Sequence, residues 1–324
     1  MIKKKTTYLV TGCAGFIGFH VCKILLEKQN KVLGIDNINN YYDKDLKINR
    51  LRILKKNKIN FKFYKIDICN FEKMEQIFIK LNKFKVIHLA AQAGVRYSLK
   101  YPKTYIRSNL LGFWNILELS KKYKTEHFVF GSSSSVYGAN KKIPFNEEDS
   151  TDNPIQLYAA TKKSNEVIGY SYSSLYKMKV TALRFFTVYG PWGRPDMAIF
   201  KFTKNIINNK PIDVYNKGNH YRDFTFVKDI ARGIISASFR KDKKNFQIFN
   251  IGNGKPVYLK KLIQTLEIIL KKRAVKNFLP IQKGDMKSTY ANTNKFNNTF
   301  TGKFVPLKKG LIEFVNWFRN YYEK

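Results

Sequence analysis

The stretch Tyr8-Leu9-Val10-Thr11-Gly12-Cys13-Ala14-Gly15-Phe16-Ile17-Gly18 decides the fold of this protein. Residues 8–10 are an apolar run that predicts a short buried strand, and the apolar spacing of residues 15–28 predicts a helix. Three glycines lie between the two elements. Because glycine has no side chain, a pyrophosphate can approach the backbone amides and the positive end of the helix there. The stretch therefore predicts a strand–loop–helix unit that binds a dinucleotide.

Asp36 supports this interpretation. It ends the second predicted strand, residues 31–36, at the distance from the glycine loop that is typical of dinucleotide-binding units. A carboxylate at this place can accept hydrogen bonds from both ribose hydroxyls, which favours NAD over NADP. We therefore predict NAD as the cofactor. Taken alone, the glycine spacing would also fit a turn without a ligand, and Cys13 is interpreted as a small buried residue.

Strand and helix patterns alternate along the first part of the chain. Further strands are predicted at residues 60–66, 85–90, 127–132 and 180–186, and further helices at residues 71–81, 102–123 and 156–176. This order predicts an α/β fold with a doubly wound parallel sheet. Past Gly190, prolines and glycines interrupt the pattern. We predict a cofactor-binding domain over residues 1–190 and a smaller substrate-binding lobe over residues 191–324, with residues 225–252 packing back on the first domain.

Tyr158 and Lys162 form the second chemical signal. They are four residues apart in a predicted helix, so they lie on the same face. A free tyrosine has a pKa of about 10, and a neighbouring ammonium group favours its ionised form. Tyr158 can then take a hydroxyl proton while a hydride leaves the same carbon. The same spacing also arises by chance in helices, so by itself it is a hypothesis.

Four serines, residues 132–135, follow the strand predicted at residues 127–132. Ligands of open α/β sheets bind at the carboxyl edge of the strands, where these serines are expected. The Ser133 hydroxyl can hydrogen-bond a substrate oxygen and relay a proton to Tyr158. The alternative interpretation of such a run is a flexible polar turn.

The charge of the chain is strongly positive. Its 60 Lys and Arg residues against 23 Asp and Glu residues give a formal net charge of +37. Such a charge is typical of proteins that bind nucleic acids or anionic membranes. However, 44% hydrophobic residues are enough for a buried core, and the lysines are scattered over predicted loops and helix ends, as an AT-rich coding sequence would produce. We therefore expect no specific nucleic-acid partner.

We expect a cytoplasmic protein without a metal or membrane insertion. Its three cysteines, Cys13, Cys22 and Cys69, give no disulfide framework. No apolar stretch approaches the 18 residues of a membrane-spanning helix. The basic start of the chain is followed by the glycine loop, which interrupts the apolar stretch of a signal peptide.

Several further motifs carry a resemblance to a known family. They are Asp36-Asn37 with Tyr41-Tyr42-Asp43, HLAAQAGVRYS at residues 88–98, residues 132–138, residues 158–162, LRFFTVYGPWGRPDM at residues 183–197, residues 210–214 and residues 222–225. Together with the glycine loop, they make nearly the whole chain resemble the extended short-chain dehydrogenases/reductases that act on nucleotide sugars. The UDP-glucuronate 4-epimerases are the most similar subfamily. The resemblance implies a Rossmann-type fold and an NAD-dependent isomerase.

The resemblance implies roles for individual residues. Tyr158 would be the catalytic base, Lys162 would lower its pKa and bind the ribose, and Ser133 would aid proton transfer. NAD would be bound by Gly12, Gly15, Phe16, Ile17, Gly18, Asp36, Asp67, Ile68, Ala90, Ala91, Gln92, Tyr158 and Lys162. The UDP-sugar would be bound by Arg96, Ser134, Ser135, Thr187, Arg194, Arg222 and Asp285. In this set Arg222 would contact a phosphate, which suits a guanidinium group, and Asp285 the ribose.

The implied reaction is the epimerisation of UDP-glucuronate to UDP-galacturonate through a 4-keto intermediate. That intermediate is a β-keto acid and can lose CO2, so an epimerase must hold the carboxylate in a poor alignment for this loss. Ser134, Ser135 and Thr187 can do so, with Arg96 as a charge partner. Related UDP-glucuronate decarboxylases carry a glutamate near the position of Ser135, and related 4,6-dehydratases carry an Asp-Glu pair there.

Other functions stay open at this point. They are a 4-epimerase for UDP-glucose or for UDP-N-acetylglucosamine, a UDP-glucuronate decarboxylase, a sugar 4,6-dehydratase, and a non-catalytic Rossmann protein with affinity for nucleic acid. The family resemblance also implies a homodimer, formed through the helices predicted at residues 102–123 and 156–176.

Overall fold

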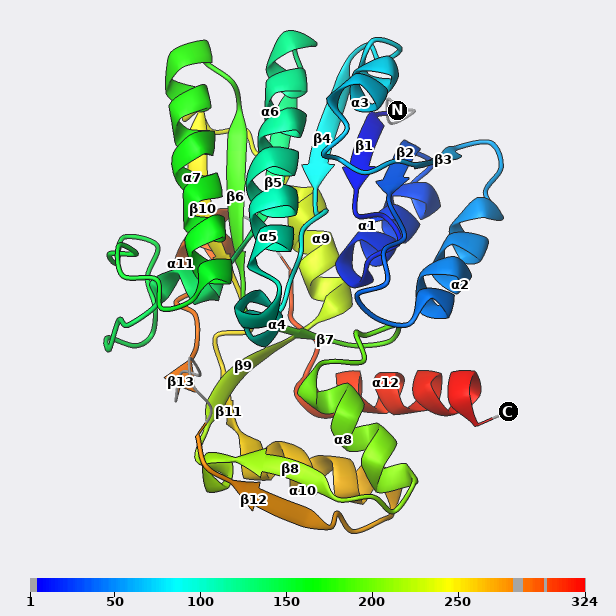
Figure 1. The fold of residues 1–324 in the computed structure, drawn as a ribbon, viewed down its shortest axis with the longest axis vertical. Coiled ribbons are helices and arrows are strands. Elements are labelled where there is room, and N and C mark those ends of the chain that lie inside the picture. Colours follow the sequence, from blue (N-terminus) through cyan, green and yellow to red (C-terminus); the bar gives the residue numbers. More distant parts are fainter. Residues whose placement is uncertain (1–4, 282–287, 300–301, 324) are drawn as a thin grey trace.

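The computed structural model describes residues 5–281, 288–299 and 302–323 (Figure 1). Its larger part is built on a sheet of seven strands in the order β10-β6-β5-β4-β1-β2-β3. All neighbouring strands of this sheet run parallel. The strands are β1 Thr7–Thr11, β2 Lys31–Asp36, β3 Phe61–Lys65, β4 Phe84–His88, β5 His127–Ser133, β6 Val180–Phe185 and β10 Phe246–Ile251. The strand order reverses between β1 and β4, so the predicted doubly wound α/β fold is confirmed.

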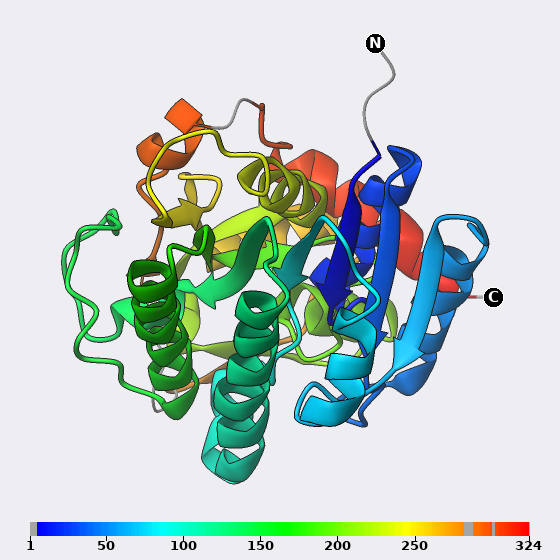
Figure 2. The ribbon, with the colours of Figure 1, turned by 90° about the horizontal axis from the view of Figure 1, so that it is seen from above.

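Helices cover both faces of this sheet (Figures 1 and 2). One face carries α1 (Phe16–Glu27), α2 (Lys44–Lys55) and α9 (Val227–Ala237), and the other carries α3 (Phe71–Phe78), α6 (Gly112–Lys122) and α7 (Leu157–Tyr176). Because side chains alternate along a strand, β1 supplies both layers. Tyr8 and Val10 pack with Phe19 and Ile234 in one apolar core, whereas Leu9 packs with Leu117 in the other.

The structure differs from the sequence prediction at α2, which was not predicted. Asp43 begins this helix, because its carboxylate accepts a hydrogen bond from the Asp45 amide at 2.8 Å. Leu46, Leu51 and Leu54 form its buried face. Five lysines and arginines in the helix obscure this apolar spacing in the sequence.

The long helix predicted at residues 102–123 is also wrong in one respect, because it is not continuous. After α4 (Val95–Lys100) the chain forms α5 (Pro102–Tyr105), a π-helical segment η1 (Ile106–Leu111), and then α6. The π-helical segment contains Asn109, which is 1% exposed and bonds with both backbone groups of Gln92. Short π-helical segments frequently occur at functional sites, which directs attention to this residue.

The smaller part lies below the carboxyl edge of the large sheet in the view of Figure 1. Its strands are β7 (Thr187–Tyr189), β8 (Ile212–Tyr215), β9 (Tyr221–Phe226), β11 (Pro256–Tyr258), β12 (Lys276–Leu279) and β13 (Ser288–Thr289). Helices α8 (Ala198–Ile207), α10 (Leu259–Leu270) and α12 (Leu307–Tyr322) enclose an apolar core with residues of β8 and β9. Two 3-10 turns, η2 (Ser134–Tyr137) and η3 (Asn216–Gly218), and α11 (Asn294–Thr299) complete the described elements.

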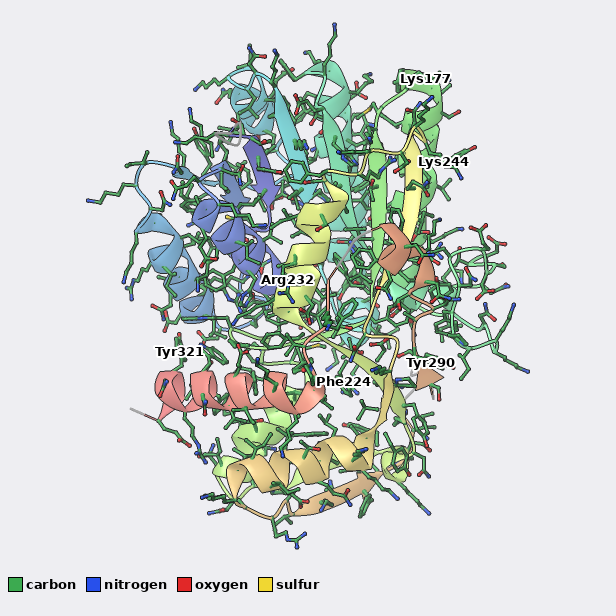
Figure 3. The ribbon with its side chains drawn as sticks, turned by 180° about the vertical axis from the view of Figure 1, so that it is seen from behind. Lys177, Phe224, Arg232, Lys244, Tyr290 and Tyr321 are labelled. Carbon is green, nitrogen blue, oxygen red and sulfur yellow. The ribbon has the colours of Figure 1, made fainter. Side chains whose placement is uncertain are left out.

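The chain returns to the larger part after β9. Helix α9 packs on α1, and β10 pairs with β6 as the last strand of the large sheet. Figure 3 shows this passage from behind, from Phe224 in the smaller part to Arg232 in α9. A boundary between two domains at residue 190 stays a prediction. Strands β7 and β9 lie on either side of this residue in the sequence, and they pair with each other in the structure. No helix among the described residues is long and apolar enough to cross a membrane.

Candidate active site

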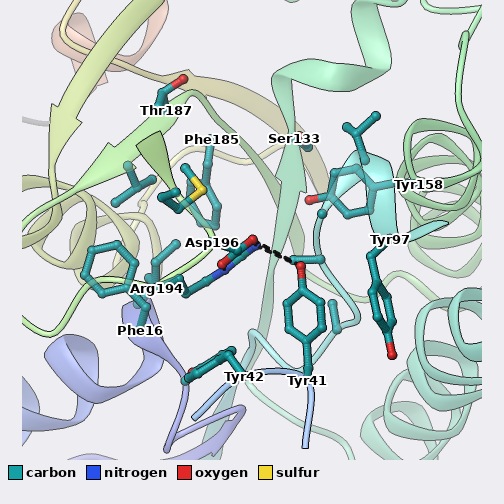
Figure 4. Close-up of a pocket in the computed structure, with 18 of the residues that line it drawn as sticks. Phe16, Tyr41, Tyr42, Tyr97, Ser133, Tyr158, Phe185, Thr187, Arg194 and Asp196 are labelled. Carbon is teal, nitrogen blue, oxygen red and sulfur yellow. Dashed lines mark hydrogen bonds and ion pairs between the residues drawn. The ribbon is translucent and has the colours of Figure 1, made fainter. Parts of the chain in front are cut away.

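One cavity of about 880 Å³ lies at the carboxyl edge of the large sheet, and both parts of the molecule line it (Figure 4). The loops after β1, β2, β4 and β5 contribute to its wall, as do β7, β8 and β9. The predicted site residues that line the cavity are Gly12, Gly15, Phe16, Ile17, Gly18, Asp36, Asp67, Ile68, Ala90, Ala91, Arg96, Ser133, Ser134, Ser135, Tyr158, Lys162, Thr187, Arg194 and Arg222. Asp285 lies outside the described residues.

The glycine loop has the geometry that a dinucleotide needs. A Cβ atom on Gly18 would lie 2.1 Å from the Gly12 carbonyl oxygen, and Gly12 has a φ of +72°. Larger residues would therefore displace the loop. The first turn of α1 has no side-chain cap at Gly15, so its amide groups remain available for an anion. These features fit the pyrophosphate of NAD.

Asp36 is held in place at the other side of this loop. One carboxylate oxygen accepts a hydrogen bond from the Ala14 amide at 3.1 Å, and the other accepts one from the Ile38 amide at 2.8 Å. An ionised carboxylate has further lone pairs, so two ribose hydroxyls can still donate to it. Asp67 is anchored in a similar way. Burial opposes its ionisation, but hydrogen bonds from Cys69 and Asn37 outweigh this and hold its pKa below the ordinary value.

Gln92 does not belong to the lining of the cavity. Its side chain is buried and donates to the Ala93 carbonyl at 3.2 Å. Asn109 bonds with both backbone groups of Gln92, at 2.8 and 3.0 Å, and so fixes the backbone of this segment, whose neighbouring residues Ala91 and Ala93 line the cavity. That Gln92 binds NAD stays a prediction.

Tyr158 and Lys162 lie on the face of α7 that borders the cavity. Burial raises the pKa of Tyr158, while a hydrogen bond with Ser133 and the charge of Arg194 oppose this shift. The Lys162 ammonium group donates to the Gly131 carbonyl at 2.7 Å. Burial lowers its pKa to about 8, and the Glu166 carboxylate opposes that shift. An ionised Tyr158 thus requires positive charge near its oxygen.

Two buried residues that the sequence prediction missed support this pair. Glu166 accepts two hydrogen bonds from Arg184, at 2.8 and 2.9 Å, and one from the Ser132 hydroxyl at 2.6 Å. Both charged side chains are nearly inaccessible to solvent, with 3% and 2% exposed. The ion pair therefore connects α7 with β5 and β6 directly behind the serines.

Asn109 is a third residue that the prediction missed. Besides its bonds with Gln92, its side chain donates to Thr161 Oγ1 at 3.1 Å, and its carbonyl accepts from Asn165 at 2.6 Å. The π-helical segment thus connects the loop after β4 with the helix that carries Tyr158. A buried Asn within an apolar helical stretch is the only sequence signal for it.

The hydroxyl groups predicted for substrate binding line the same cavity as Tyr158. Ser133 donates to Ser135 Oγ at 3.2 Å, and Thr187 begins β7 (Figure 4). Arg222 lies on β9, which pairs with β7 in the smaller part. Arg96 extends from α4 to the ring of Tyr215 on β8, with 5.0 Å between the guanidinium carbon and the ring centre. Polar groups from both parts therefore face the same space.

Arg194 forms an ion pair inside the cavity. Its Nε atom donates to Asp196 at 3.0 Å, and the Tyr41 hydroxyl donates to the same carboxylate at 3.1 Å (Figure 4). Burial opposes the ionisation of both charged groups. Their mutual attraction outweighs it, so the pKa of Arg194 is raised and that of Asp196 is lowered. Tyr41 and Asp196 stood in the quoted motifs, but their place in the cavity was not predicted.

A doubly wound sheet with this glycine loop, an acid after β2 and a Tyr–Lys pair beside serines defines the dinucleotide-dependent enzymes of the short-chain dehydrogenase/reductase type. The sequence model of the NAD dependent epimerase/dehydratase family matches residues 8–252. The protein belongs to this family, and NAD is its cofactor. Among the described residues, no group of three or more His, Cys, Asp or Glu side chains is placed to hold a metal ion.

Relatives with known names are similar over nearly their full length. A UDP-glucuronate 4-epimerase of Thermodesulfobacterium geofontis is 45% identical, covering 96% of this chain and 95% of its own. The crystal structure of a UDP-glucuronic acid 4-epimerase from Bacillus cereus, in complex with UDP-glucuronic acid and NAD, has a TM-score of 0.92 at 33% identity, covering 98% of this chain and 100% of its own. A UDP-glucose 4-epimerase structure from Thermotoga maritima has a TM-score of 0.87 at 31% identity, covering 98% and 99%.

Proposed function

We propose that the protein epimerises UDP-glucuronate at C4 to give UDP-galacturonate. The observation that carries this proposal is the single cavity that joins the NAD loop to Tyr158 and, beyond it, to hydroxyl groups of both parts. Two similar proteins support the choice of substrate. One is a UDP-glucuronate 4-epimerase with 45% sequence identity, and the other is a UDP-glucuronic acid 4-epimerase whose crystal structure has a TM-score of 0.92.

In the proposed reaction Tyr158 accepts the proton of the sugar O4 hydroxyl and later returns it. Bound NAD supplies the hydride chemistry, taking a hydride from C4 and giving it back to the opposite face. Ser133 bonds with the Tyr158 hydroxyl and can relay the proton. Because burial raises the pKa of Tyr158, the Lys162 ammonium is needed to favour the phenolate. The sugar must turn within the cavity between the two hydride transfers.

The cavity also bears on the choice between epimerisation and decarboxylation. No glutamate lines it among the described residues, and its aspartates are Asp36, Asp67, Asp196 and Asp213. Asp196 is paired with Arg194, and Asp213 accepts a hydrogen bond from Asn277. The hydroxyls of Ser134, Ser135 and Thr187 can bind a carboxylate without protonating the sugar carbon. This supports an epimerase over a decarboxylase or a 4,6-dehydratase.

A second candidate function is the epimerisation of a neutral UDP-sugar. The observation that favours it is the Arg194–Asp196 ion pair, because a neutralised arginine offers less attraction to a carboxylate. The likeness to the Thermotoga maritima UDP-glucose 4-epimerase agrees with this candidate, at a lower TM-score than the UDP-glucuronic acid enzyme.

The test is to incubate the purified protein separately with UDP-glucuronate, UDP-glucose and UDP-N-acetylglucosamine, and to separate the products. We expect UDP-galacturonate from the first substrate and no turnover of the other two. Turnover of only the neutral sugars would replace the proposal by the second candidate. Formation of UDP-xylose would show decarboxylation in its place.

We also propose that the protein is a homodimer. Large apolar side chains are exposed on the outer faces of α6 and α7, which pack side by side (Figure 1). Trp114 is 42% exposed, and Val167 and Tyr170 are 56% and 60% exposed. Light scattering should show a particle of twice the chain mass of 38.0 kDa. In the Val167→Asp variant the measured mass should fall to that of a single chain. A dimer unaffected by this change would place the interface elsewhere.

The proposed compartment is the cytoplasm. Cys13 and Cys22 are buried, Cys69 is partly exposed, and all three are free thiols. This state is the usual one where glutathione keeps thiols reduced.

A further inference from the structure

Arg50 of α2 is a charged residue that the proposed reaction does not use. It is 0% exposed and lies beneath the glycine loop. Its guanidinium nitrogens donate to three oxygen atoms: the Ala14 carbonyl at 2.8 Å, the Tyr42 hydroxyl at 2.6 Å and the Trp192 carbonyl at 2.6 Å. Ala14 belongs to the glycine loop, and Trp192 belongs to the segment that enters the smaller part. One side chain thus holds both halves of the site.

The segment around Trp192 is constrained from several sides. Trp192 has a φ of +61°, a conformation that non-glycine residues rarely adopt. Its ring contacts Phe19 of α1 and both Trp317 and Tyr321 of α12, with ring centres 5.1 to 5.7 Å apart. Such a conformation persists only where its surroundings enforce it, and these contacts together with Arg50 do so.

This constrained segment leads directly into the cavity. Two residues after Trp192 comes Arg194, and Asp196 follows it. Asp196 accepts a hydrogen bond from Tyr41, the neighbour of Tyr42. The Tyr41-Tyr42 motif therefore connects with the smaller part twice, through its own contact with Asp196 and through Arg50.

The acceptors of Arg50 are all neutral oxygens, which makes its burial costly. A buried charge is normally paired with an opposite charge, because burial of an unpaired charge costs free energy. The hydrogen bonds that Arg50 donates to neutral groups must therefore contribute something that an uncharged residue would not. An apolar residue of similar size would fill the same space. It could not connect the Ala14 carbonyl with the Trp192 carbonyl, because that requires the separate nitrogens of a guanidinium fork.

We propose that Arg50 is a positioning residue that couples the two ligand sites, so that NAD on the glycine loop strengthens the binding of the UDP group in the smaller part. The identity of the second ligand rests on the proposed function. Bound NAD fixes the backbone of the glycine loop. Because Arg50 bonds with both this loop and the Trp192 carbonyl, that carbonyl is then fixed as well. The segment with Arg194 is thereby held in its binding position. Linkage requires the effect to be reciprocal, so UDP also strengthens the retention of NAD.

The test compares the wild-type protein with Arg50→Lys and a matched control, Arg240→Lys. Arg240 is also buried, at 5% exposed, but it bonds with the Val180 and Asn245 carbonyls at the opposite end of the sheet and does not line the cavity. Calorimetry measures the dissociation constant of UDP on each protein, once freed of NAD and once loaded with it. UDP lacks a sugar, so no turnover disturbs the measurement.

We expect NAD to tighten UDP binding to the wild-type protein by about 5-fold or more, the lower end of typical coupling. Arg240→Lys should keep this ratio, and Arg50→Lys should bring it close to one, because one ammonium cannot reach both carbonyls. A wild-type ratio of one, or an unchanged ratio in Arg50→Lys, overturns the coupling while the proposed function stands. A wild-type protein that binds no UDP in either state overturns both.

Hydrogen–deuterium exchange on the wild-type protein gives a second readout that needs no variant. Loading with NAD should slow exchange at residues 190–196 as well as at residues 11–18. Protection confined to residues 11–18 overturns the coupling, even if Arg50→Lys proves too unstable to purify.

Discussion

Replacing Glu166 by glutamine should move the alkaline limit of activity to lower pH. Glu166 follows Lys162 by one turn of α7 and is bound by Arg184 and Ser132. Burial lowers the pKa of Lys162 to about 8, and the Glu166 carboxylate is the group that opposes this. If activity requires the Lys162 ammonium, it falls as the pH rises through that pKa. Without the carboxylate the pKa falls further, so activity is lost at a lower pH.

The size of the shift follows from the geometry. Residues four apart on a helix have Cβ atoms about 5–6 Å apart. At an effective dielectric constant of about 20, unit charges at that distance interact by about 3 kcal/mol, which corresponds to about two pK units. Because the Lys162 ammonium points toward Gly131, we expect a shift of at least about one pH unit.

The assay is the pH dependence of kcat for wild type, Glu166→Gln and Glu267→Gln. Glu267 is a suitable control because it is a buried glutamate paired with Lys276, on α10 in the smaller part. Both variants should have a lower free energy of unfolding than the wild type. The loss should be larger in Glu166→Gln, at about 3–5 kcal/mol, because this change leaves Arg184 buried without its partner. Only Glu166→Gln should shift the alkaline limb.

An alkaline limb that stays in place in Glu166→Gln would refute the reasoning. It would mean that Lys162 does not titrate in the measured range or that its charge is not required. Equal shifts in both variants would instead point to a general loss of stability at high pH.

Three further predictions address the cofactor, the base and the substrate. Gly18→Ala should abolish NAD retention, measured by absorbance of the purified protein, because the added Cβ would lie 2.1 Å from the Gly12 carbonyl oxygen; retained NAD would contradict the assigned loop. Tyr158→Phe should retain NAD but lose turnover in the product assay, and near-normal activity would exclude Tyr158 as the base. Thr187→Val should reduce kcat/KM for UDP-glucuronate by about 10- to 100-fold, the value of a hydrogen bond to a charged group, and leave the dissociation constant of UDP unchanged; equal losses in both would show a change in the smaller part as a whole.

Local patterns predicted the first half of the fold well. The strands and helices that flank the glycine loop were predicted from apolar periodicity, which reports the burial of one face without further information. The same patterns missed α2, where lysines and arginines cover an apolar face, and they predicted one helix across η1. These charged residues obscure the pattern because two of them, Lys47 and Arg50, are themselves buried in this structure.

Residues distant in sequence were predicted with less success. Arg222 and Thr187 were assigned through motifs, but their meeting in one cavity depends on the pairing of β7 with β9. Asn109, Glu166 and Arg50 carry no motif that a single sequence reveals. Apart from Tyr42, which is 8 residues from Arg50, their partners are 17 to 142 residues away. For Gln92 the motif indicated a place at the nicotinamide side, and only the structure shows that its side chain is buried and that its backbone is bonded to Asn109.

The sequence by itself determined the cofactor loop, the acid after β2 and the spacing of Tyr158 and Lys162. Each of these lies within one or two adjacent elements, where helix and strand geometry place the side chains. Only the tertiary structure decided which groups meet across the cavity, how Arg194 is paired with Asp196, and how Arg50 connects the two parts. These contacts join segments far apart in the chain, and they exist only after the large sheet and the smaller part have packed together. Burial then decides their charge and pKa, which no local pattern contains.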